Sequence, residues 1–233
     1  MIICVGDSLT FGNVGCSYRK YLTTVRTINK GFNGDPLMGI YKRLLRILKN
    51  PKYAKAQTYI IGGGTNDILL PALKHHSLFW KLFNTARPAV MGYRYCCNSQ
   101  SFQYMYEKII LLLLKHHKKV ILIGIPKSEV GNLPLNDTIQ SRNLIIQELA
   151  QKYNLPYINV YEMISSLQKK PVHTYNWGKT IAMRLFDATL MTLFPFSKDM
   201  LSRIRHLCAT VDGIHYNSST ARQLARMIEL KLK

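Results

Sequence analysis

The sequence predicts an α/β domain in which helices cover both faces of a parallel sheet. Short apolar runs that end at glycine or proline alternate with longer segments whose apolar residues recur at helical spacing. Such alternation is typical of doubly wound domains. The chain has 233 residues, 47% of them hydrophobic, which is enough for one sizeable core. No linker, repeat or low-complexity stretch divides it, so we expect a single domain over residues 1–233.

Five segments are predicted to be strands because they are short, apolar and followed by turn residues. They are residues 1–5, 22–29, 58–61, 120–125 and 157–160. The first ends at Gly6, the third at three successive glycines and the fourth at Pro126. The second has the weakest pattern, since it depends on Val25 and Ile28.

Four longer segments are predicted to be helices from the 3.6-residue recurrence of their apolar side chains. They are residues 36–49, 102–117, 136–153 and 219–232. Pro36 suits the first turn of the first helix, where a missing N–H removes no hydrogen bond. Ser219 is the expected N-cap of the last helix.

Two stretches, about 71–101 and 166–206, exceed what the sheet and its covering helices require. The first places Trp80 among other large apolar and basic residues. The second contains an apolar segment over 177–194 and a short helix near 198–205. We expect both insertions near the functional site, because they lie next to the blocks described below.

Four short polar blocks carry the candidate chemistry. They are Gly6-Asp7-Ser8-Leu9, Asn33-Gly34-Asp35, Gly64-Thr65-Asn66-Asp67 and Asp212-Gly213-Ile214-His215. The first and third follow predicted strands, whose carboxyl ends form the usual site of doubly wound domains. A serine hydroxyl needs an adjacent base to act as a nucleophile. In the last block, an aspartate three residues before a histidine can orient the imidazole toward such a serine.

Taken in this order, the blocks resemble the signature of the SGNH hydrolases, also called the GDSL esterase/lipase superfamily. The resemblance covers most of the chain and implies a flavodoxin-like three-layer α/β/α sandwich with five parallel strands. It implies that Ser8 is the nucleophile, His215 the base and Asp212 its orienting acid. The backbone N–H groups of Ser8 and Gly34 and the side-chain amide of Asn66 would form the oxyanion hole. This chemistry needs no cofactor and no metal.

Each block alone also has a structural interpretation, as a turn serine, turn glycine, turn asparagine or surface Asp-x-x-His loop. Their joint occurrence in one order favours the catalytic interpretation. The chain has no Gly-x-Ser-x-Gly elbow, and its candidate serine lies near the N-terminus. Both features argue against the α/β-hydrolase fold.

The main functional prediction is a serine esterase or acylhydrolase that cleaves acyl esters through an acyl-enzyme. Large apolar side chains beside Lys and Arg in both insertions suit a lipid-like or amphiphilic substrate. The same aromatic residues could equally serve to pack the inserted helices onto the domain. Two alternatives stay open: a carbohydrate O-acetyl esterase of the same fold, and a non-catalytic protein that binds an anionic surface or nucleic acid.

The net charge of +20 is what suggests the second alternative. Residues 71–119 hold eight Lys and Arg against one acid, and residues 165–206 hold seven against two. The sequence contains no recognition helix, RNA-binding aromatic motif or zinc module, so nucleic acid is not an expected partner. Contact with an anionic surface through the insertions remains open, and nothing indicates the oligomeric state.

Bulk features favour a cytoplasmic protein. No apolar run approaches the roughly 20 residues of a membrane-spanning helix. Met1 leads straight into the first strand, so there is no room for a signal peptide unless a leader has been removed. The five cysteines have no metal-ligand or disulfide spacing, and their odd number suits a reducing compartment.

Overall fold

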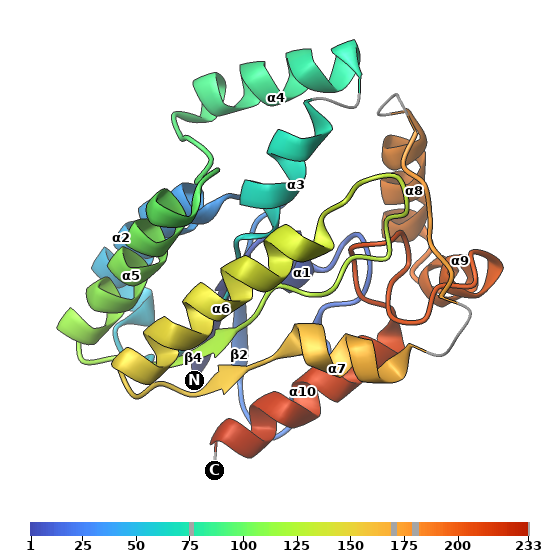
Figure 1. The fold of residues 1–233 in the computed structure, drawn as a ribbon. Helices are drawn as coiled ribbons and strands as arrows, with labels where there is room; N and C mark the ends of the chain where they lie inside the picture. Colours follow the sequence, from blue (N-terminus) through green and yellow to red (C-terminus); the bar gives the residue numbers. More distant parts are fainter. Residues whose placement is uncertain (75–76, 169–171, 179–181, 233) are drawn as a thin grey trace.

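A computed structural model describes residues 1–74, 77–168, 172–178 and 182–232. Its centre is a parallel sheet with the strand order β2-β1-β3-β4-β5 (Figure 1). The strands are β1 (Ile2–Gly6), β2 (Thr27–Gly31), β3 (Thr58–Gly62), β4 (Lys119–Ile123) and β5 (Tyr157–Ile158). This is the flavodoxin-like order, so the predicted fold class is confirmed.

Strand register brings the polar blocks to one edge of the sheet. Gly6 at the end of β1 pairs with Gly31 of β2 on one side and with Gly62 of β3 on the other. The three strands therefore end at the same level, and the loops that follow them leave the sheet side by side.

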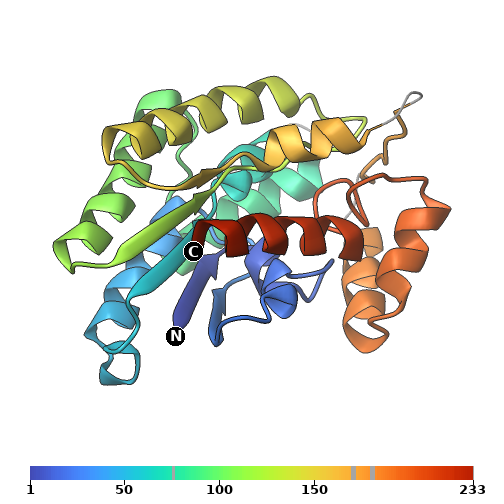
Figure 2. The same ribbon diagram turned by 90° about the horizontal axis from the view of Figure 1, so that it is seen from below.

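Helices cover both faces of the sheet. The described chain forms α1 (Ser8–Phe11), α2 (Leu37–Lys49), α3 (Thr65–Leu73), α4 (Leu78–Met91), α5 (Ser99–Lys115), α6 (Asn136–Lys152), α7 (Val160–Leu167), α8 (Ala182–Leu193), α9 (Ser197–Ile204) and α10 (Ser218–Leu232), with 3-10 turns η1 (Tyr18–Tyr21) and η2 (Pro51–Tyr53). Helices α2, α5 and α6 pack side by side on one face, whereas α10 lies on the other face against η1 (Figures 1 and 2). None of the described helices is long and apolar enough to cross a membrane.

The core lies between these layers and is centred on β1, β3 and β4. Ile3, Cys4, Ile60 and Leu122 are completely buried. Strands that are covered on both faces appear in a sequence as continuous apolar runs, which is why these strands could be predicted. The five cysteines all carry free thiols.

The four predicted helices are confirmed to within three residues at each end, but the second strand was misplaced. It occupies Thr27–Gly31 rather than 22–29. Strand β2 is at the edge of the sheet and all five of its residues are only half-buried, so no apolar run marks it. The sequence analysis also missed α1, α3 and α7, which begin within three residues of the strands that precede them.

Both insertions lie beyond the carboxyl ends of the strands (Figure 1). The first contains α4, whose N-cap Ser77 accepts a hydrogen bond of 3.3 Å from the Trp80 backbone. The second contains α8 and α9. The predicted apolar segment over 177–194 is helical from Ala182 to Leu193, and residues 179–181 lie outside the described chain.

Candidate active site

Ser8 is the first residue of α1 and follows β1 after a tight turn. Asp7 caps the helix, since its Oδ1 accepts a hydrogen bond of 2.9 Å from the Leu9 backbone. A side chain at Gly6 would collide with Thr10 and with the carbonyl of Gly62, so the turn requires glycine there. The backbone N–H of Ser8 belongs to the first turn of α1, where N–H groups have no intrahelical acceptor.

The last block brings an imidazole to this serine across 207 residues of chain. His215 Nε2 lies 2.9 Å from Ser8 Oγ. On the other side of the ring, His215 Nδ1 lies 2.8 Å from Asp212 Oδ2. The second oxygen, Asp212 Oδ1, accepts hydrogen bonds from the backbone N–H groups of Ile214 (3.0 Å) and His215 (2.8 Å). These bonds hold the carboxylate beside the ring.

The carboxylate of Asp212 is completely buried and has a second cationic neighbour that the sequence analysis missed. Arg184 of α8 forms an ion pair through Nη2 with the same Oδ2 atom that faces His215. Burial alone would raise the pKa of Asp212. The Arg184 guanidinium and the His215 imidazole outweigh that effect and hold the pKa well below its usual range. Asp212 therefore stays ionised at any pH near neutrality.

Arg184 is itself held in place by the second insertion. Its guanidinium stacks 4.1 Å from the ring centroid of Trp177, whose Nε1 donates a hydrogen bond of 2.8 Å to the Asp212 carbonyl. Asp187 lies 3.5 Å from Arg184 and forms a second ion pair of 2.8 Å with Arg205. The second insertion thus contacts both the carboxylate and the backbone carbonyl of Asp212.

The first insertion reaches the same place through its aromatic residues. Trp80 of α4 stacks on Trp177 with ring centroids 6.4 Å apart, and its Nε1 donates a hydrogen bond of 3.3 Å to the Gly178 carbonyl. The two insertions therefore contact each other next to the Asp212 block.

The loops after β2 and β3 are joined beside Gly34. The amide of Asn66, near the start of α3, donates a hydrogen bond of 3.1 Å to the Asp35 carbonyl. A primary amide has two N–H donors, so one remains for another acceptor. Gly34 has a φ of 66°, a left-handed conformation that suits glycine. The Phe32 backbone donates to the Gly6 carbonyl at 3.1 Å, which ties this loop to the turn that carries Ser8.

Two arginines stabilise the arrangement of these loops. Arg43 of α2 donates to the Gly6 carbonyl at 2.9 Å and forms an ion pair with Asp35. Arg87 of α4 donates to the Asn33 carbonyl at 2.6 Å. Neither arginine was singled out from the sequence, because both lie on helices outside the four blocks.

Asp67 connects the first insertion to α2 through hydrogen bonds. Its two carboxylate oxygens accept backbone hydrogen bonds from Leu37 (2.9 Å) and Cys96 (2.8 Å). Burial raises its pKa to about 7, although both hydrogen bonds act in the opposite direction.

Several cations of the second insertion point inward. Arg184 and Arg205 form buried or half-buried ion pairs, and Lys198 Nζ donates to the carbonyls of Gly12 (3.0 Å) and Gly15 (2.7 Å). The surface of this insertion is therefore less basic than its net charge suggests, because these three cations bind carboxylates and carbonyl groups inside the protein. The remaining cations include three that lie outside the described residues, Lys169, Lys170 and Lys179.

The arrangement can perform nucleophilic acyl transfer. It combines a hydroxyl, a base and a buried orienting acid with backbone and amide donors on adjacent loops. In the part of the chain that the structure describes, no group of three or more His, Cys, Asp or Glu side chains is placed to hold a metal ion.

A family model described as the GDSL-like Lipase/Acylhydrolase family matches residues 4–178. Among curated proteins, no sequence matches the chain. The matched range contains the first three blocks, whereas the Asp212 block lies beyond it and is placed by the structure alone.

Solved structures with the same fold include several hydrolases. A lipase/acylhydrolase from Enterococcus faecalis has a TM-score of 0.59 and 20% identity, with 99% of this chain and 94% of that chain covered. A GDSL-like lipase from Bacteroides thetaiotaomicron has a TM-score of 0.59 and 16% identity, with 98% and 85% covered. A catalytic mutant of an acetylxylan esterase from Geobacillus stearothermophilus has a TM-score of 0.56 and 16% identity, with 99% and 93% covered.

Proposed function

Because the chain belongs to the GDSL-like lipase/acylhydrolase family, we propose that it hydrolyses acyl esters by forming an acyl-enzyme on Ser8. The observation that carries this assignment is the distance of 2.9 Å between His215 Nε2 and Ser8 Oγ. A serine hydroxyl becomes a nucleophile when a neutral imidazole is within hydrogen-bond reach to accept its proton.

In the first half-reaction, Ser8 Oγ attacks the ester carbonyl carbon while His215 Nε2 accepts the hydroxyl proton. The tetrahedral intermediate then collapses, and the leaving alkoxide takes that proton from Nε2 as it departs as an alcohol. In the second half-reaction, water attacks the acyl carbon and passes a proton to His215 Nε2. The bond between the acyl carbon and Ser8 Oγ then breaks, Oγ takes that proton back from Nε2, and the acid is released. Asp212 stays ionised throughout and stabilises the imidazolium.

The negative charge on the tetrahedral oxygen is stabilised by three donors in this proposal. They are the backbone N–H groups of Ser8 and Gly34 and the free N–H of the Asn66 amide. Each preorganised donor of this kind contributes about 3–4 kcal/mol to lowering the barrier. The hydrogen bond between Asn66 and the Asp35 carbonyl supports this role, because it holds the amide beside Gly34.

The choice of acyl substrate is supported by exposed apolar side chains on the two insertions. Leu78, Leu82 and Val90 of α4 and Phe186 of α8 are all more than half exposed. Such groups suit an amphiphilic ester or its aggregates. The inward-facing cations of the second insertion leave less support for an anionic head group than the charge count suggested.

A carbohydrate O-acetyl esterase is the second candidate. The acetylxylan esterase with the same fold motivates it, although at 16% identity the likeness extends to the fold alone. The two candidates differ in the leaving group and the acyl chain. Release of acetate from acetylated xylo-oligosaccharides, with little turnover of butyryl or longer esters, would favour the second.

The proposal is tested by labelling and kinetics on four proteins. Wild type should react with a fluorophosphonate probe and hydrolyse a chromogenic ester, whereas Ser8→Ala should do neither. His215→Ala should lose several orders of magnitude in kcat/KM, since the imidazole and serine act as a unit. Ser141→Ala, an exposed serine on α6, is the control and should match wild type. Wild-type turnover by Ser8→Ala would exclude the assignment.

A further inference from the structure

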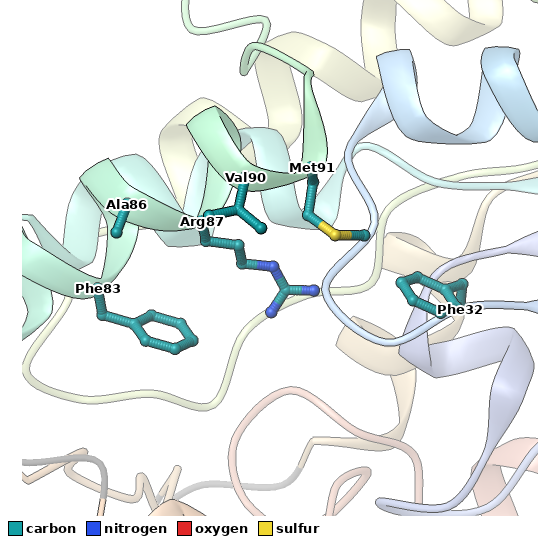
Figure 3. A pocket seen from close by; sticks show the side chains of 6 residues that line it. All are labelled: Phe32, Phe83, Ala86, Arg87, Val90 and Met91. Atoms are coloured by element: carbon teal, nitrogen blue, oxygen red, sulfur yellow. The ribbon is translucent and has the colours of Figure 1, made fainter.

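An apolar pocket lies between α4 and the loop after β2. Its volume is about 420 Å³, which is within the usual range for small-ligand sites. It is lined by Phe32, Phe83, Ala86, Arg87, Val90 and Met91. Figure 3 shows Arg87 extending from α4 between Phe83 and Phe32, with Met91 above. Five of the six lining side chains are apolar, so the pocket suits a hydrocarbon group.

The pocket adjoins the loop that holds Gly34. Phe32 is two residues before Gly34, and its backbone is bonded to the turn that carries Ser8. Arg87 lies directly over Gly34, because a Cβ built there would come within 2.5 Å of its Nη2 atom. A group seated between Phe32 and α4 is therefore connected to the proposed oxyanion donors through a single loop.

Among the described residues, Arg87 is the one polar side chain that lines the pocket, and two of its five N–H groups are engaged by the protein. Arg87 donates through Nη2 to the Asn33 carbonyl at 2.6 Å and through Nε to the Tyr93 hydroxyl at 2.9 Å. A sugar ring would need several further donors and acceptors along the walls to satisfy its hydroxyl groups, and the remaining lining side chains are apolar. The pocket chemistry thus favours an alkyl chain over a carbohydrate.

The apolar walls are left open to water in the absence of such a group. Val90 is 84% exposed, Met91 is 44% exposed and Phe32 is 45% exposed. Burying apolar surface of this kind is favourable and roughly additive per methylene. A chain laid along α4 would bury these side chains together with its own methylene groups.

We propose that this pocket binds the acyl chain of the substrate, so that the enzyme prefers esters of unbranched medium-chain acids, of about four to eight carbons, over acetyl esters. The inference rests on the proposed function, since it assigns the acyl group of the same reaction. Each added methylene that is fully buried should raise kcat/KM by up to about fourfold. The rise should stop when the chain fills the pocket.

The test measures kcat/KM for p-nitrophenyl esters from acetyl to octanoyl with wild type, Ala86→Trp, Val90→Asp and Ala89→Trp. Wild type should favour hexanoyl over acetyl by at least tenfold. Ala86→Trp fills the pocket and Val90→Asp puts a charge on its wall, so each should lower the hexanoyl-to-acetyl ratio by about tenfold or more. Ala89→Trp is the matched control, because Ala89 is exposed on the same helix but does not line the pocket, and it should keep the wild-type ratio.

Two outcomes would overturn the pocket assignment while leaving the proposed function intact. They are a flat or falling profile in a wild-type enzyme whose activity still depends on Ser8, and an unchanged ratio in both pocket variants. An unchanged ratio together with a lower sedimentation coefficient in the variants would assign the pocket to self-association instead. Loss of the Ser8 dependence itself would refute the proposed function, and the two failures are therefore distinguishable.

Discussion

Arg184 and His215 share one carboxylate oxygen, Oδ2 of Asp212. The arginine comes from the second insertion and the histidine from the last block, so the proposed triad acid contacts two basic side chains at once. The ion pair with Arg184 also helps to hold the pKa of Asp212 well below its usual range. Arg184 is therefore expected to act as a positioning residue that keeps the ionised carboxylate beside the imidazole.

Replacement of Arg184 by methionine should lower kcat/KM on a chromogenic ester by roughly 10–100-fold. The reason is that the buried Asp212 carboxylate would lose the ion pair that helps to keep it ionised and in place. Arg205→Met is the matched control, since Arg205 forms an equally buried ion pair with Asp187 but does not pair with Asp212. It should lower the melting temperature but keep most of the wild-type kcat/KM, and an equal loss of kcat/KM in both variants would contradict the idea.

Replacement of Asn66 by alanine should reduce kcat by about 10²–10³-fold with little change in KM. The amide would no longer stabilise the tetrahedral oxygen, an interaction that the ground state lacks. Steady-state kinetics on a short-chain ester measure the effect. Asn136→Ala removes an amide that bonds only to the Ser128 backbone and should leave kcat unchanged. A change in KM alone for Asn66→Ala would argue against the oxyanion role.

Asp7 should make the protein less stable as the pH rises from 4 to 8. Burial raises its pKa to about 6, although the Leu9 hydrogen bond acts in the opposite direction. The folded state therefore holds this proton more tightly than the unfolded state, whose carboxyl titrates near 3.8. The stabilisation that this proton provides is fully present below pH 3.8 and is lost as the pH rises through about 6.

Asp7→Asn tests this linkage by removing the charge and keeping the helix cap. Urea unfolding should find the variant more stable than wild type by roughly 2–3 kcal/mol at pH 8 and almost equal at pH 4. Asp137→Asn, an exposed first-turn residue of α6, should show no such pH-dependent gain. A gain that is the same at both pH values would rule out the protonation mechanism.

Replacement of Asn84 by leucine should stabilise the fold by about 1–3 kcal/mol. Asn84 is a completely buried residue of α4, and neither polar atom of its side chain has a hydrogen-bond partner in the described structure. Asn143→Leu is the opposite case, because its amide bonds to both polar backbone groups of Ile125, and it should destabilise by a similar amount. Urea midpoints measure both effects, and destabilisation by Asn84→Leu would contradict the idea that the Asn84 amide makes no hydrogen bond in the folded protein.

Strand prediction succeeded where burial was complete and failed where it was partial. Strands β1, β3 and β4 are covered on both faces, so each contains a run of buried apolar residues that is recognisable in the sequence. Strand β2 is half-exposed along its length, so no apolar run marks it, and the predicted strand began at residue 22 rather than at Thr27. Helix α1 was missed because its four residues are too few for an apolar periodicity to develop. Helix α3 was missed because seven of its nine residues are buried, so it has no clear polar face, and the start of α7 at Val160 was assigned to the preceding strand.

The candidate catalytic blocks were recognisable in the sequence because acyl transfer requires particular side chains, and doubly wound domains place such side chains after their strands. Ser8 and Asn66 were expected to meet at one sheet edge, since parallel strands bring their carboxyl ends together. Of the two side chains that contact the Asp212 carboxylate in the described part of the chain, only one was predicted from the sequence. His215 lies three residues away on the same turn, whereas Arg184 approaches from 28 residues upstream and appeared only as one more positive charge.

The sequence by itself therefore determined the fold class and the identity of the polar side chains at the strand ends. Buried strands and tight turns depend on residues that are close together in the sequence, so local patterns predict them. Tertiary structure alone decided which cations are internal, where α4 lies relative to Gly34 and what walls the pocket beside it. These features depend on contacts between insertions and distant loops. Such contacts are set by packing and charge pairing across the whole fold, and no local pattern encodes them.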